Sequence, residues 1–211
     1  VKTQYKARVI TTPISEDALA GFGFGSSITD LRPVFVHIRS EFLTLCMNQI
    51  INMISSHSYS TLGKISVPLF IRVVIGRGWG QGYQHSKSLM SVFGHIPGLI
   101  VTAPTTPSDA WNFTKASLVA RNPVIQFEHR WLYWQKGEIA EETAPIGKSK
   151  NRRKGTDVTI IAISWMNIEA MQAADFLKEY DISCEIIDPR TLTNIDYSLI
   201  TKSVAKTGLC L

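Results

Sequence analysis

Short runs of β-branched and other apolar residues alternate along the chain with segments of helical periodicity, and this alternation is the strongest constraint on the fold. Strands joined by helices of this length favour parallel pairing, so we predict an α/β fold built on parallel sheets. In such sheets, ligands bind beyond the carboxyl ends of the strands. The predicted strands cover 33–38, 68–74, 99–103, 124–128, 158–163 and 183–188, after a short β-like lead at 1–11. The predicted helices cover 15–29, 41–55, 86–93, 107–120, 167–179 and 196–204.

The alternation is interrupted at 138–155, a charged stretch that contains Pro145 and two glycines and has little periodicity. We therefore predict a first α/β domain at 1–137, a linker at 138–155, and the start of a second α/β domain at 156–211. Much of the net charge of +5 lies in this linker. Its basic residues have no aromatic residues between them, which favours a solvated linker over a nucleic-acid site. They are Lys148, Lys150, Arg152, Arg153 and Lys154.

Composition argues against several classes of protein. A chain of 211 residues with 45% hydrophobic and 18% charged content is typical of a soluble globular protein rather than a disordered one. Its longest apolar stretch, 67–75, is interrupted by Pro68 and Arg72 and is too short to span a bilayer. No signal or transit segment is recognisable. The three cysteines and five histidines are scattered, which favours reduced thiols and argues against a zinc site. We expect neither nucleic acid nor a membrane as a partner.

The segment Thr12-Pro13-Ile14-Ser15-Glu16 places a carboxylate at the start of a predicted helix that is rich in small residues. Small residues let a helix approach another backbone or a flat ligand closely. A carboxylate at a helix N-terminus is also favoured by the helix dipole alone. From the residues alone, a solvated carboxylate matched to the dipole is the favoured interpretation of Glu16, ahead of a catalytic group.

Two further candidates for a site lie in the next part of the chain. Phe42 falls within the helical periodicity of 41–55, which by itself favours core packing. The glycine-rich segment 76–82 has neither the dinucleotide-binding fingerprint nor the spacing of a phosphate-binding Walker loop. We interpret it as a flexible wall that carries His85 towards a ligand.

Short sequence motifs occur along the whole length of the chain, and their order and spacing can be compared with those of known families. Besides Thr12–Glu16 these are Leu31-Arg32-Pro33, Gln49-Ile50-Ile51-Asn52, Val67-Pro68-Leu69, Gln84-His85-Ser86, His95-Ile96-Pro97-Gly98-Leu99, Asn122-Pro123-Val124, Asp188-Pro189-Arg190-Thr191-Leu192 and Lys206-Thr207-Gly208. With these motifs the chain resembles the beta subunit of thiamine-diphosphate-dependent 2-oxo acid dehydrogenases, of the pyruvate and branched-chain type. The resemblance implies a pyrimidine-binding α/β domain followed by part of a transketolase C-terminal-like α/β domain. Relative to that family the chain lacks an amino-terminal strand and helix and continues no further than the start of the second domain.

The resemblance implies a role for four residues. Glu16 matches the glutamate that hydrogen-bonds N1′ of the cofactor's aminopyrimidine, and a carboxyl group there favours the imino form that removes the C2 proton. Phe42 matches an aromatic residue that packs on that ring, and Ile38 is expected at the same cofactor. His85 matches a catalytic histidine near the reacting carbon, where a pKa near neutrality suits proton transfer.

The resemblance also implies cofactors and partners. The chain lacks the Gly-Asp-Gly…Asn motif that holds diphosphate and Mg²⁺, so an alpha subunit is expected to supply that half of the site. A second beta subunit and a lipoyl acyltransferase complete the expected heterotetramer and multienzyme complex. The expected location is the cytoplasm in a bacterium, and the mitochondrial matrix or plastid in a eukaryote. A potassium ion is implied at the backbone carbonyls of Leu69, Ser117, Leu118, Ala120 and Asn122.

The implied function is oxidative decarboxylation of a 2-oxo acid, with pyruvate the first choice, and transfer of the acyl group to a lipoyl arm. Two alternatives remain open at this point. A transketolase-like or deoxyxylulose-phosphate-synthase-like enzyme would share the pyrimidine domain, although Thr12–Glu16 argues against it. An inactive binding subunit would fit the incomplete ends, although the presence of Glu16, Phe42 and His85 argues against it.

Overall fold

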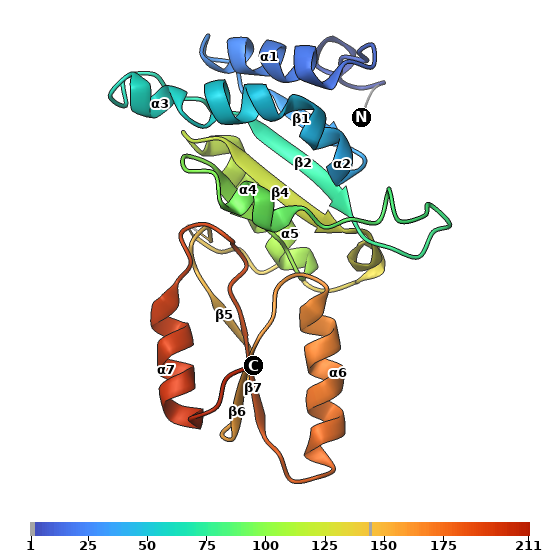
Figure 1. Cartoon of the computed structure of the whole chain (residues 1–211), viewed down its shortest axis with the longest axis vertical. Helices are drawn as coiled ribbons and strands as arrows, with labels where there is room; N and C mark the ends of the chain where they lie inside the picture. The colour runs from blue at the N-terminus through green and yellow to red at the C-terminus, as the bar shows by residue number, and fades with distance from the viewer. Residues whose placement is uncertain (1–2, 144) are drawn as a thin grey trace.

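The computed structural model describes residues 3–143 and 145–211. It shows two β-sheets, each accompanied by helices, with one unit above the other in Figure 1. The upper sheet is called sheet A here and the lower one sheet B. The predicted α/β fold with a second α/β unit is therefore confirmed.

Sheet A consists of four parallel strands in the order β1-β2-β4-β3. Because all four run in the same direction, their carboxyl ends lie along one edge of the sheet. The loop that follows β2 projects beyond the arrowhead of that strand at the right of Figure 1. The strands are β1 (Val34–His37), β2 (Phe70–Ile75), β3 (Ile100–Thr102) and β4 (Val124–His129).

The main hydrophobic core lies between sheet A and the helices that precede β3. It combines buried side chains from the helices, such as Phe24 and Leu43, with Ile71 and Val73 of β2 and Phe127 of β4. Each fully buried side chain of this kind contributes about 1.5–3 kcal/mol. The opposite face of the sheet is covered in part by α5 (Figure 1). The helices are α1 (Glu16–Ser27), α2 (Ser40–Leu43), α3 (His57–Ser60), α4 (Met90–Gly94) and α5 (Pro107–Val119).

Sheet B has the order β5-β7-β6, with β7 antiparallel to β5 and parallel to β6. Its helices α6 (Met166–Lys178) and α7 (Tyr197–Thr207) lie on opposite sides of it in Figure 1. Every residue of β7 is buried, as expected for a central strand. Residues 209–211 run beside β6, where Leu211 N donates to Thr159 O at 2.9 Å. The strands are β5 (Lys150–Arg153), β6 (Val158–Ile161) and β7 (Cys184–Asp188).

The segment that follows β7 joins the two units. Residues 190–193 run antiparallel to β3, with Ala103 N donating to Arg190 O and Leu192 N donating to Val101 O, both at 2.9 Å. The Leu192 side chain packs against the core of sheet A. A segment of the second unit therefore continues the edge of the first sheet.

A buried cluster of charges lies at the same junction. Arg152 Nη2 contacts Asp109 and lies 2.7 Å from Asp188 Oδ2, while Arg190 Nη1 lies 3.2 Å from Asp109 Oδ1 and 2.8 Å from Glu142 Oε2. The side chains of both aspartates are fully buried, and that of Arg190 is 2% exposed. Burial alone would raise the pKa of Asp109, but the charges of Arg152 and Arg190 and bonds from the Thr105–Thr106 turn outweigh it and lower that pKa. Burial dominates at Asp188, whose pKa is raised.

Three predicted elements differ in the structure. The β-like lead at 1–11 contains, within its described part, the short 3-10 helix η1 (Lys6–Arg8) in place of a strand, and Ile10 is exposed. The helix at 41–55 is divided into α2, the 3-10 helix η2 (Thr44–Cys46) and the π-helix η3 (Gln49–Ile54). The hydroxyl of Thr44 bonds back to Glu41 O at 2.6 Å, and such local bonds compete with regular helix geometry. The helix at 86–93 is reduced to α4, because the backbone at Lys87 is bound to α2.

The prediction of a solvated linker is wrong for 150–153. These residues form β5 in sheet B, and the Arg152 side chain, which is 12% exposed, lies in the charge cluster. A basic residue lies in the interior here because two aspartates from distant parts of the chain neutralise it. Within the described residues, no helix is both long enough and apolar enough to cross a membrane.

Candidate active site

The residues predicted for the site come together at the carboxyl edge of sheet A. Glu16 is the first residue of α1, which runs back along the sheet so that its N-terminus lies near the end of β1. Ile38 follows β1 directly, and Phe42 belongs to the short α2 that begins two residues later. His85 lies in the loop between β2 and α4, which leaves the same edge. The topology of a parallel sheet therefore places all four residues on one side of the molecule.

Glu16 lies beside two side chains for which no role was predicted. Its charge raises the pKa of His37, while burial, the larger effect, lowers it, and the net pKa of His37 is below its usual value. Burial raises the pKa of the Cys46 thiol to about 12, with Asp17 and Glu16 acting in the same direction. Within the described residues the half-buried Glu16 carboxylate accepts no hydrogen bond, so its oxygens are available to a ligand.

Phe42 and His85 are in direct contact, with ring centroids 5.5 Å apart and ring planes at 53°. Among the described residues, His85 Nδ1 is buried without a hydrogen-bond partner. A buried polar atom without a partner lowers the stability of the fold unless a ligand or a water molecule forms a hydrogen bond with it. The pair thus presents a half-buried aromatic ring next to an imidazole nitrogen that lacks a partner.

The loop that carries His85 is held by α2. Ser40 Oγ donates to Lys87 O at 3.0 Å, and Lys87 N donates to Glu41 Oε1 at 3.2 Å. These two bonds hold the backbone two residues beyond His85 against the helix that contains Phe42. Sequence reasoning missed Ser40 and Glu41, because no local pattern indicates a bond between segments 46 residues apart.

The glycine-rich start of the same loop is packed on an aromatic cluster. The ring centroid of Trp131 lies 4.8 Å from that of Trp165 and 5.8 Å from that of Trp79. The Arg130 guanidinium lies 4.9 Å from the centroid of the Trp79 ring. A side chain at Gly78, where φ is +94°, would approach the Trp131 ring to 3.1 Å. The predicted flexible wall is therefore anchored at its beginning by tryptophans and at its end by α2.

His129 is part of this aromatic cluster. Its ring stacks on Trp165 with centroids 5.5 Å apart, and its Nδ1 accepts a hydrogen bond from Trp131 N at 3.3 Å. Burial, assisted by the charge of Arg77, lowers the pKa of His129 to about 4. The ring is accordingly neutral near pH 7.

This shifted pKa predicts a pH dependence of stability. Between about pH 4 and pH 6.5 the unfolded chain binds a proton at residue 129 and the folded chain does not, so the unfolding free energy falls as the pH is lowered through this window. Urea titrations of the wild type and His129→Asn from pH 6.5 to 5.5 test this, and the variant should show the shallower slope. His95→Asn, at an exposed position, is the control. Equal slopes for the wild type and His129→Asn would refute the expectation.

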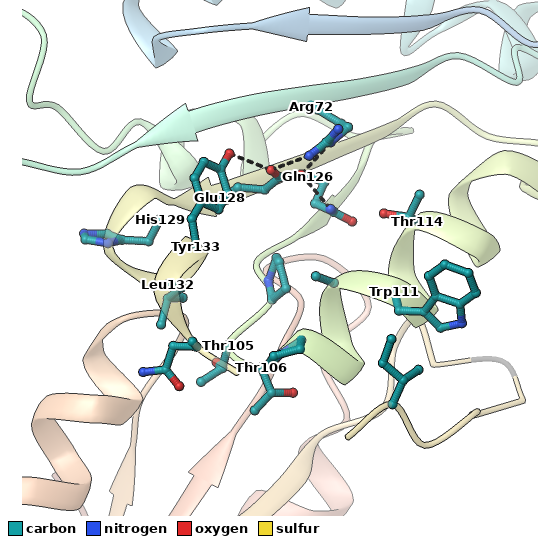
Figure 2. A pocket seen from close by; sticks show the side chains of 15 residues that line it. Arg72, Thr105, Thr106, Trp111, Thr114, Gln126, Glu128, His129, Leu132 and Tyr133 are labelled. Atoms are coloured by element: carbon teal, nitrogen blue, oxygen red, sulfur yellow. Dashed lines mark hydrogen bonds and ion pairs between the residues drawn. The ribbon is translucent and has the colours of Figure 1, made fainter. Parts of the chain in front are cut away.

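A second cluster lies on the face of sheet A that α5 partly covers. Arg72 Nε and Nη2 each lie 2.7 Å from a carboxylate oxygen of Glu128, which also accepts from Tyr133 Oη at 2.7 Å and Gln126 Nε2 at 2.8 Å. These bonds, led by that of Arg72, outweigh burial and lower the pKa of Glu128. Figure 2 shows the network along one wall of a cavity of about 420 Å³, opposite Thr106 and Trp111. Arg72 could have been singled out from the sequence, because a charge inside an apolar strand needs a partner.

Four of the five carbonyls predicted for potassium, those of Leu69, Ser117, Leu118 and Ala120, accept hydrogen bonds from the protein. Leu69 O accepts from Val124 N at 2.9 Å, and Ser117 O accepts from Ala120 N at 3.3 Å. Leu118 O and Ala120 O both accept from Arg32 Nη1, at 3.1 and 3.0 Å. Two of these oxygens, those of Leu118 and Ala120, are therefore bound to the positively charged Arg32 guanidinium, which opposes a metal ion at the same position. Elsewhere in the described residues, no group of three or more His, Cys, Asp or Glu is placed to hold a metal.

The fold defines an α/β protein with a candidate ligand site at the carboxyl edge of a parallel sheet, followed by a second α/β unit. Residues 1–135 match the family described as transketolase, pyrimidine binding domain, and residues 147–211 match transketolase, C-terminal domain. The chain belongs to the transketolase pyrimidine-binding-domain family.

Curated relatives are similar over nearly the whole chain. The acetoin:2,6-dichlorophenolindophenol oxidoreductase subunit beta of Bacillus subtilis is 37% identical over 205 residues, which are 96% of this chain and 60% of that protein. The mitochondrial pyruvate dehydrogenase E1 component subunit beta-2 of Oryza sativa subsp. japonica is 37% identical over 95% of this chain and 55% of its own length. The 2-oxoisovalerate dehydrogenase subunit beta of B. subtilis is 34% identical over 95% of this chain and 62% of its own length. The chain thus spans about 60% of the length of the curated relatives it matches.

A solved structure supports the fold. A split-gene transketolase, described as an inactive beta4 tetramer, superposes with a TM-score of 0.82 at 22% identity and covers 99% of this chain and 65% of that one. At this identity the similarity bears on the fold alone. The family match and the curated relatives confirm the resemblance drawn from the motifs.

Proposed function

We propose that the chain acts as the beta subunit of a thiamine-diphosphate-dependent 2-oxo acid dehydrogenase and contributes the half of the active site that faces the cofactor's aminopyrimidine. The observation that carries this proposal is the convergence of Glu16, Phe42 and His85 at one edge of sheet A. Relatives named for pyruvate, acetoin and 2-oxoisovalerate conversion support it.

The residues at this edge fit the pyrimidine side of the cofactor. The half-buried Phe42 offers a surface for a flat ring, and the Glu16 carboxylate is open to a ring nitrogen. His85 Nδ1, which lacks a partner among the described residues, fits a donor or acceptor on the bound substrate. The chain has no Gly-Asp-Gly…Asn motif, so diphosphate and Mg²⁺ belong to the proposed alpha subunit.

Each residue then has a distinct task. Thiamine diphosphate, when bound, supplies the carbanion chemistry of decarboxylation. Glu16 holds a proton at N1′ of the aminopyrimidine. Phe42, and Ile38 at the end of β1, orient the ring by contact. His85 moves a proton at the substrate oxygen, a task suited to a group held by Phe42 on one side and by the Ser40 and Glu41 bonds to Lys87 on the other.

The proposed assembly contains an alpha subunit, a second beta subunit and a lipoyl acyltransferase that accepts the acyl group. Its compartment follows from the host, namely the cytoplasm in a bacterium and the mitochondrial matrix or plastid in a eukaryote. Plant relatives carry mitochondrial and chloroplastic designations.

Reconstitution tests the proposal. The full-length gene product is co-expressed with an alpha subunit, and reduction of dichlorophenolindophenol is followed with thiamine diphosphate, Mg²⁺ and either pyruvate, branched-chain 2-oxo acids or acetoin. We expect turnover only when both subunits are present, and the preferred substrate identifies the branch of the family. Stable pairing of the subunits without turnover on any substrate would contradict the proposal and support an inactive binding subunit.

A further inference from the structure

Arg32 makes an unusual contact at the C-terminal end of α5. A single nitrogen, Nη1, donates to Leu118 O at 3.1 Å and to Ala120 O at 3.0 Å, although 86 and 88 residues separate Arg32 from these positions. The last carbonyls of a helix lack partners within the helix and carry the negative end of its dipole. A cation at this position is therefore favoured electrostatically.

The backbone beside Arg32 is fixed by the sheet. Pro33 O accepts a hydrogen bond from Phe70 N at 3.1 Å, so the residue after Arg32 is tied to the start of β2. Leu69, the residue before Phe70, accepts a bond from Val124 N at the start of β4. Arg32 thus extends from an ordered corner, where the starts of β1, β2 and β4 meet, to the end of α5.

A metal ion at these carbonyls would compete directly with Arg32. An ion bound to Leu118 O and Ala120 O would lie within a few ångström of Nη1, because both oxygens are 3.0–3.1 Å from that nitrogen. Two like charges at such a separation repel each other, so the guanidinium and a metal ion would not bind these oxygens together. Carbonyl cages bind K⁺ by replacing its hydration shell, which requires their oxygens to point at the ion.

We propose that the Arg32 guanidinium takes the position of the monovalent cation at the end of α5, so that the fold of this corner does not depend on K⁺. The Arg32 guanidinium links the α1–β1 connection to the end of α5 through Leu118 O and Ala120 O, as a bound ion would link them. Because the guanidinium is part of the chain, this contact needs no ion from the solvent. The proposal concerns the stability of the fold and does not depend on the proposed reaction.

Thermal unfolding in different salts tests the proposal. The wild-type protein is melted in KCl, NaCl and choline chloride at equal ionic strength, beside Arg32→Met and the control Arg121→Met, whose guanidine instead donates to Ser66 Oγ at 2.9 Å. We expect the Tm of the wild type and of Arg121→Met to agree between the three salts within about 1 °C. Arg32→Met should melt several degrees lower in choline or sodium, and KCl should restore much of that loss.

Two results would overturn the proposal. The first is a saturable, K⁺-specific rise in the wild-type Tm, and the second is an Arg32→Met protein that is destabilised equally in all three salts. A thallium(I) soak of wild-type crystals gives an answer even if Arg32→Met does not fold. An anomalous peak within coordination distance of Leu118 O and Ala120 O would refute the replacement, and its absence is the expected result.

Discussion

Replacing Asp109 with alanine is expected to lower the free energy of unfolding by about 3–5 kcal/mol, the usual cost of removing one partner from a buried ion pair. The Asp109 side chain is fully buried and contacts both Arg152 and Arg190. It also accepts hydrogen bonds from Thr105 N at 3.2 Å and Thr106 N at 2.9 Å at the start of α5. The variant would leave Arg152 and Arg190 with less negative charge around them. It would also remove the Asp109 half of the capping box at the start of α5, while Thr106 would remain as the N-cap.

Urea denaturation at pH 7 measures this loss. The matched control is Lys115→Ala, on the same helix, because Lys115 and Glu141 form an ion pair 2.8 Å long whose side chains are 51% and 73% exposed. An exposed pair of this kind contributes about 0–1 kcal/mol, so the control should unfold nearly as the wild type does. If Asp109→Ala cost no more than Lys115→Ala, the charge cluster would have no structural role.

The second large effect is expected on catalysis. In the reconstituted enzyme, Glu16→Gln should lower kcat by about 10²–10⁴-fold, the contribution typical of a positioned proton-transfer group. The amide is close in size to the carboxyl group but does not share a proton with a ring nitrogen in the same way. Because Glu16 is half-buried at the start of α1 and has no hydrogen bond within the described residues, the Tm should change by no more than a few degrees.

Asp17→Asn is the control for Glu16→Gln. Asp17 is also in the first turn of α1 and is exposed, so its substitution removes the same charge from the same helix terminus. Comparing kcat of the two variants therefore separates the effect of losing a charge at the helix N-terminus from the effect of losing the proton-transfer group. Turnover of Glu16→Gln within about threefold of the Asp17→Asn value would exclude Glu16 as the activating group, even if the enzyme proved to be a 2-oxo acid dehydrogenase.

Much of the fold follows from local patterns in the sequence. The runs at 68–74 and 124–128 are rich in β-branched residues and form β2 and β4. The helix predicted at 107–120 begins at Pro107 and is preceded by Thr106, which forms a capping box with Asp109. Glu16, Phe42 and His85 were identified by resemblance, and from the residues alone Glu16 and Phe42 had ordinary structural explanations. Parallel topology accounts for their convergence, since each lies on a segment that adjoins the same sheet edge.

The features that sequence analysis missed depend on contacts between distant segments. Arg72 and Glu128 are 56 residues apart, and Arg152 meets an aspartate 43 residues before it and another 36 residues after it. The basic stretch at 148–154 was interpreted as solvated because it has no aromatic residues between its charges, and that pattern does not indicate the distant aspartates that bind Arg152. The division of the predicted helix at 41–55 was also missed. Side chains in this segment bond to the backbone, for example Cys46 Sγ to Leu43 O at 3.1 Å, and hydrophobic periodicity gives no information about such bonds.

The charge cluster at the junction has a consequence for recombination of this chain with its homologues. Asp109 lies before 138–149, Glu142 lies within it, and Arg152, Asp188 and Arg190 lie after it. A recombination crossover at 138–149 would exchange the two halves of the chain between homologues. Asp109 would then come from one parent, and Arg152 and Arg190 from the other. Chimeras should therefore tolerate exchange there only when both parents carry the same charges at these five positions, and a library designed around this junction should select parents at those positions first.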